Sequence, residues 1–69
     1  MVPYQIENIL FKLNCFVYIF NQEHGIIENS KYSDGSSYNG IKEISNIVIE
    51  LQAVGIKYSI DENQNIVLE

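Results

Sequence analysis

The sequence predicts a small α+β domain in which one antiparallel sheet of four strands carries two helices on one face, in the order αββαββ. Two stretches show apolar residues at helical spacing, and each is followed by a run with strand character and a polar turn. A chain of 69 residues is long enough for one domain only. We therefore expect residues 1–69 to form a single core.

The first predicted helix covers residues 3–14. Pro3 suits the first turn of a helix, where its missing N–H is not needed. Asn14 suits the end, because Asn tolerates the left-handed conformation that stops a helix. Apolar residues recur between them at the spacing of one helix face: Ile6, Ile9, Leu10 and Leu13.

The run Cys15–Phe20 is rich in β-branched and aromatic residues, which favours a strand. The turn Asn21–Gly25 and the return strand Ile26–Asn29 would complete a hairpin. Both faces of the first strand are apolar: Phe16, Tyr18 and Phe20 on one side, and Cys15, Val17 and Ile19 on the other. The alternative is one long helix that continues to about Glu23 and is capped by Gly25.

The polar segment 30–40 would link this unit to a second helix. Asn39 or Gly40 is the expected N-cap, Glu43 would lie in the first turn, and Gly55 would follow the last residue. Apolar residues line one face of this helix: Ile41, Ile44, Ile47, Val48, Leu51 and Val54.

The second hairpin follows directly. Residues 56–60 alternate between apolar and polar, residues 61–65 are polar, and residues 66–69 return. Residues 44–67 also match residues 6–27 if two positions are inserted after the helix. The sequence therefore indicates an internal repeat of an α-β-β unit.

The composition gives a formal net charge of −5, and all four basic residues are lysines. Binding of DNA or RNA requires cationic side chains against phosphates, so we do not expect it. No stretch reaches the roughly 18 apolar residues of a membrane span, and the N-terminus does not have the pattern of a signal peptide. With a single cysteine and no internal disulfide, we expect a cytoplasmic protein.

The sequence predicts no enzyme, no cofactor and no metal site. The single histidine, His24, falls in a turn, and the single cysteine, Cys15, falls in an apolar run where a thiol is unreactive. These two residues lack the further ligands that a metal site needs. Asp61 and Glu62 are adjacent and point apart, and a glycine-rich phosphate loop is absent.

Apolar residues at outward positions indicate a homodimer. The outer side of the first strand has no polar residue, and each helix carries one large apolar residue opposite its buried stripe. Such surface is normally covered by another protein, often a second copy of the same chain. The expected interface residues are Phe11, Cys15, Val17, Ile19 and Ile49.

A second candidate surface is polar and acidic. Tyr32, Asp34 and Tyr38 lie among Ser and Gly, which is a composition typical of binding loops. Four carboxylates would add an acidic surface for a basic partner: Glu43, Glu50, Asp61 and Glu62.

These surfaces predict a small acidic protein-binding module that acts as a homodimer and modulates or inhibits a basic host protein. Its size and acidity resemble those of small phage and prophage proteins. One alternative is an assembly homodimer without a separate ligand site. A weaker alternative is a winged-helix-like protein associated with nucleic acid, because a helix followed by a hairpin occurs there, although the acidity and the lack of arginine oppose it.

Overall fold

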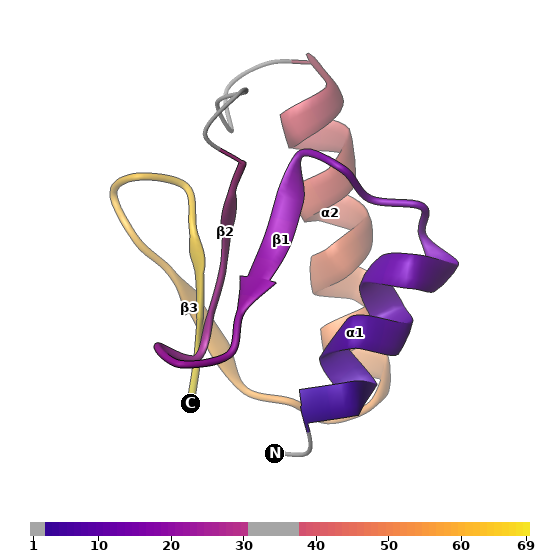
Figure 1. Cartoon of the computed structure of the whole chain (residues 1–69), viewed down its shortest axis with the longest axis vertical. Helices are drawn as coiled ribbons and strands as arrows, with labels where there is room; N and C mark the ends of the chain where they lie inside the picture. The colour runs from indigo at the N-terminus through magenta and orange to yellow at the C-terminus, as the bar shows by residue number, and fades with distance from the viewer. Residues whose placement is uncertain (1–2, 31–37) are drawn as a thin grey trace.

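The computed structural model describes residues 3–30 and 38–69 and confirms the predicted α+β class. Its elements are α1 (Pro3–Lys12), β1 (Tyr18–Asn21), β2 (Ile26–Asn29), α2 (Tyr38–Ala53), β3 (Tyr58–Ile60) and β4 (Ile66–Leu68). The strands form one antiparallel sheet in the order β1-β2-β4-β3. The two hairpins therefore meet through their return strands, and β1 and β3 are the edges of the sheet (Figure 1).

Helix α1 ends with the left-handed residue that the sequence predicts. Asn14 has a φ of 56°. The N–H of Asn14 donates to the carbonyl of Phe11, and the N–H of Cys15 donates to the carbonyl of Leu10, each at 3.0 Å. This pair of bonds is the Schellman motif, which reverses the chain after a helix. The alternative of one helix continuing to about Glu23 is therefore wrong.

Helix α2 ends with the same motif. Gly55 has a φ of 76°, and its N–H donates to the carbonyl of Gln52 at 3.2 Å, while the N–H of Ile56 donates to Leu51 at 3.0 Å. The shared cap makes Leu10 the counterpart of Leu51, about one helical turn away from the counterpart that the sequence alignment gives. The order αββαββ is confirmed, and the internal repeat of sequence stays a prediction.

We predict that Gly55→Ala lowers the free energy of unfolding by about 1 to 2 kcal/mol, measured by urea denaturation. A Cβ added at Gly55 meets no atom within 4 Å, so the penalty comes from the left-handed backbone alone. Asn14→Gly is the matched control at the other cap and should change stability by less than about 0.5 kcal/mol, because Asn already tolerates this conformation. An equal loss in both variants would contradict this account of the caps.

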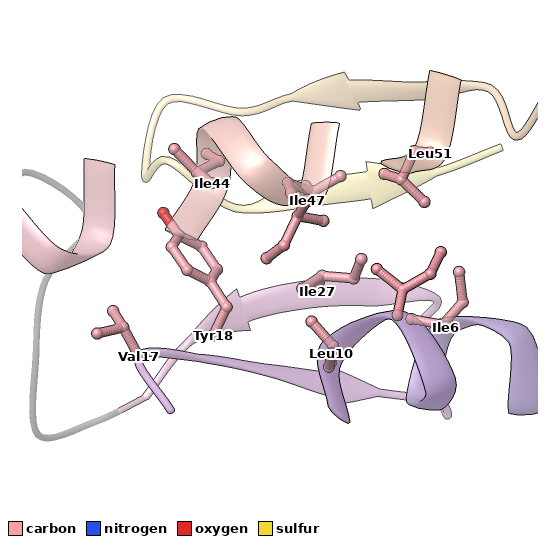
Figure 2. Close-up of a cluster of buried hydrophobic side chains, with 10 residues drawn as sticks. Ile6, Leu10, Val17, Tyr18, Ile27, Ile44, Ile47 and Leu51 are labelled. Carbon is pink, nitrogen blue, oxygen red and sulfur yellow. The ribbon is translucent and has the colours of Figure 1, made fainter. Parts of the chain in front are cut away.

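The core lies between the sheet and the two helices, which cover the same face (Figure 1). Figure 2 shows side chains from α1, α2 and the first hairpin pointing toward one another. The fully buried side chains are Ile6, Tyr18, Ile27, Ile47, Leu51 and Ile66. The hydroxyl of Tyr18 donates to the carbonyl of Gln64 at 2.8 Å, so the polar end of this buried ring is satisfied.

Helix α2 differs from its prediction in its first turn and in the width of its buried face. It begins at Tyr38, before both expected N-caps, and Glu43 consequently lies beyond the first turn. Ile41 and Val54 are 55% and 53% exposed, although the apolar pattern placed them on the buried face. Ile41 lies on the flank of the packed stripe, and Val54 lies beyond the last helical residue. The packed stripe is narrower: Gly40, Ile44, Ile47 and Leu51.

Strand β1 also differs from its prediction, because it begins only at Tyr18. In the segment before it, Phe16 is 68% exposed and Val17 is 3% exposed, so the two side chains point opposite to the expected directions. The expectation that Val17 faces outward is therefore wrong. Strand β3 is likewise shorter than predicted and begins at Tyr58 rather than Ile56.

Candidate interaction surface

The carboxylate of Glu43 holds the chain that crosses from α1 to β1. The N–H of Phe16 donates to its Oε2 at 3.2 Å, and the N–H groups of Val17 and Tyr18 donate to its Oε1 at 2.9 and 3.2 Å. Hydrogen bonds to a charged acceptor are stronger than those between neutral groups. A side chain from α2 thus accepts hydrogen bonds from three consecutive backbone N–H groups that no neighbouring strand satisfies in the described fold.

This anchor explains why the segment before β1 departs from strand geometry. With three successive N–H groups directed at one carboxylate, the backbone cannot keep the alternation of a strand. The side chain of Val17 consequently enters the core, and that of Phe16 stays exposed. Glu43 was predicted to belong to an acidic binding surface, but it is half-buried and binds within the chain.

The thiol of Cys15 lies beside the same carboxylate. Burial raises the pKa of Cys15 to about 11, and the negative charge of Glu43 contributes to the rise. The thiol therefore stays protonated at neutral pH, and a protonated thiol is a poor nucleophile. The structure thus gives Cys15 a packing role at the surface of the core.

A groove of about 340 Å³ lies between α1 and the outer edge of β1. We call it the edge groove, and the residues that line it are Glu7, Leu10, Phe11, Asn14, Cys15, Tyr18, Ile19 and Phe20. Leu10 and Tyr18 are buried in its floor, whereas Phe11 is 88% exposed and Ile19 is 51% exposed. Single exposed apolar side chains are common on protein surfaces, but several that surround one groove are unusual.

The two flanks of α1 have different surroundings. On one flank, the Lys12 ammonium lies 2.9 Å from a carboxylate oxygen of Glu50, which joins α1 to α2. Tyr4, Glu7 and Phe11 recur at the spacing of the other flank, and all three are exposed. The helix is therefore held on one side and presents an apolar and acidic stripe on the side of the edge groove.

The backbone of β1 adds hydrogen-bonding groups to the same place. The N–H of Ser30 donates to the carbonyl of Val17, so the carbonyl of Val17 is directed toward the neighbouring strand β2. Because these directions alternate along an antiparallel strand, the N–H and C=O of Phe20 point to the outer edge of the sheet. The edge groove thus combines apolar side chains with the outward-facing N–H and C=O of Phe20, which have no hydrogen-bond partner among residues 3–30 and 38–69.

Three of the four carboxylates of the predicted acidic surface make contacts within the chain. The Oδ1 of Asp61 accepts the N–H groups of Asn63 and Asn65, each at 2.9 Å, and thereby shapes the turn of the second hairpin. With Glu43 and Glu50 also engaged, Glu62 is the remaining predicted carboxylate, and it is exposed. Tyr38 is 81% exposed at the start of α2. Tyr32 and Asp34 lie outside the described residues.

The predicted dimer residues are only partly brought together. Phe11, Cys15 and Ile19 line the edge groove, whereas Ile49 is 60% exposed on α2. The groove also contains Glu7 and Phe20, which the sequence analysis does not name as site residues. Glu7 could have been found from sequence, because it lies four residues before Phe11 and shares its helix flank.

Within residues 3–30 and 38–69, no group of His, Cys, Asp and Glu side chains is placed to hold a metal ion. The helices of this described part are too short or too polar to cross a membrane. Comparison of the chain with protein-family models, curated proteins and solved structures finds no match. The surface of the molecule is therefore the basis for its functional assignment.

Proposed function

We propose that this chain is a protein-binding module whose contact surface is the edge groove. The observation that carries the proposal is the 88% exposure of Phe11 next to a hollow floored by Leu10 and Tyr18. Aromatic residues that line such hollows supply much of the binding energy of protein interfaces. An exposed phenylalanine with no packing role in the described fold is best explained by a partner that covers it.

The chemistry of the groove indicates the chemistry of the partner. Its apolar wall suits an apolar side chain as an anchor, and Glu7 on the rim suits a lysine or arginine next to that anchor. The net charge of −5 favours the same kind of partner through long-range attraction. The partner is therefore an amphipathic, basic segment of another protein, as expected for a modulator of a basic host protein.

The test replaces Phe11 by serine. A photo-crosslinking residue at position 4, on the same exposed flank of α1 as Glu7 and Phe11, first captures the partner from cells, and binding of the purified partner is then measured by calorimetry. Phe11→Ser should weaken binding at least about tenfold, which is the loss typical of an interface anchor. It should leave the unfolding midpoint unchanged, since the side chain is 88% exposed.

Ile41→Ser is the matched control, because Ile41 is also an exposed apolar residue but lies on α2, away from the groove. This variant should bind the partner normally, and added salt should weaken binding of the wild-type chain. Equal loss in both variants, or a partner captured equally well by a crosslinker at position 41, would refute the edge groove as the contact surface.

A further inference from the structure

The outer edge of β3 carries unpaired backbone groups. The carbonyl of Lys57 accepts the N–H of Glu69, and the N–H of Asp61 donates to Asn65, so residues 57 and 61 are directed toward β4. Alternation then directs the N–H and C=O groups of Tyr58 and Ile60 away from the sheet. These four groups have no hydrogen-bond partner among the described residues.

We propose that this edge pairs with the β3 edge of a second copy of the chain, in antiparallel orientation. Only one register pairs all four outward groups: Tyr58 of each copy lies opposite Ile60 of the other. The twofold axis then passes by Ser59, which faces its own counterpart. The two sheets join into one continuous sheet across the dimer, and the interface is isologous, as twofold symmetry requires.

This register also matches the side chains on both faces. Tyr58 and Ile60 lie on the helix-covered face, and each meets the other residue type of the second copy, which is a favourable aromatic and β-branched pair. On the open face, Lys57 lies directly opposite Asp61 of the second copy. Lys57 is exposed and has no ion pair among the described residues, so the dimer gives it an oppositely charged neighbour. The twofold symmetry repeats this pair of charges on the other side of the axis.

Helix α2 places further apolar surface beside this edge. The Nε2 of Gln52 donates to the hydroxyl of Tyr58 at 3.2 Å, which fixes one flank of α2 over β3. Ile41 shares that flank by helical spacing and is 55% exposed, and Ile60 itself is 47% exposed. Pairing of the two edges brings this apolar surface next to its copy.

The other sheet edge is less available. The N–H of Tyr18 at the outer side of β1 already donates to Glu43, and α1 packs alongside to form the edge groove. The β3 edge therefore serves self-association, while the edge groove at the opposite side of the sheet stays open for another protein. Strand β3 has only three residues, so the strand pairing between the two copies is short. The dimer is therefore weak, and its population depends on the protein concentration.

Cysteine cross-linking tests the register. In a background with Cys15→Ser, the variant Ser59→Cys should oxidise to a disulfide-linked dimer, since non-hydrogen-bonded antiparallel neighbours have the close Cβ atoms that a disulfide needs. Lys57→Cys and Glu62→Cys in the same background should remain largely monomeric. Equal cross-linking at all three positions indicates random collision and would overturn the proposal.

Sedimentation velocity over a concentration series tests the charge pairing without any cysteine. Lys57→Glu places like charges opposite each other and should raise the dimer dissociation constant at least about tenfold. Lys42→Glu makes the same charge change at an exposed residue of α2 and should leave the constant within about twofold. Phe11→Ser should not alter it either. A wild-type chain that stays monomeric throughout, or equal effects of the two lysine variants, would overturn the proposal.

Discussion

Val17→Asp is expected to unfold the chain. Val17 is 3% exposed in the core, and an unpaired carboxylate buried there costs several kcal/mol even after it binds a proton. A chain of 69 residues has a total stability of roughly 3 to 10 kcal/mol. We expect loss of near-ultraviolet circular dichroism and of dispersed amide resonances at any protein concentration.

Ile19→Asp is the matched control for this prediction. It lies two residues further along and carries the same substitution, but its side chain is 51% exposed on the open face of the sheet. This variant should stay folded and lose less than about 1 kcal/mol. If Val17→Asp were instead a folded monomer, Val17 would belong to a surface rather than to the core.

Glu43→Gln is expected to lower the free energy of unfolding by about 1.5 to 3 kcal/mol, the value of hydrogen bonds to a charged group. The amide keeps one acceptor oxygen but presents a donor to backbone groups that are donors themselves. The N–H groups of Phe16, Val17 and Tyr18 therefore lose much of their shared acceptor. The midpoint of thermal unfolding should fall by roughly 4 to 8 °C for each kcal/mol lost.

A second measurement on Glu43→Gln checks that the loss of the carboxylate charge causes the loss of stability. The negative charge of Glu43 contributes to the raised pKa of Cys15, so removing it should bring that pKa down from about 11. The pKa can be measured from the ultraviolet absorbance of the thiolate at temperatures where the variant is folded. Glu62→Gln removes an exposed carboxylate and should change neither stability nor the titration of Cys15. An unchanged Cys15 pKa in Glu43→Gln would contradict the proposed contact.

The sequence by itself predicted the features that depend on residues close together in the chain. Asn14 and Gly55 are the left-handed stops that the sequence predicts, and Gly25, at the end of the predicted first hairpin turn, has a positive φ. The return strand Ile26–Asn29 matches its prediction residue for residue. Turns, caps and helical stripes follow from backbone sterics and from spacing, which are properties of a few neighbouring residues.

Only the tertiary structure decided where the first strand begins and which way its first side chains point. Cys15–Phe20 has the composition of a strand, but Glu43, separated by 26 residues from Val17, accepts the N–H groups of the segment before Tyr18. The pattern of neighbouring residues contains no information about a hydrogen bond between residues so far apart in the chain. The sequence alone therefore predicts Val17 at the surface and Glu43 on an acidic face. The same fold brings Phe11 and Ile19 to one groove and leaves β3 as a free edge, because these depend on how helices and hairpins pack together.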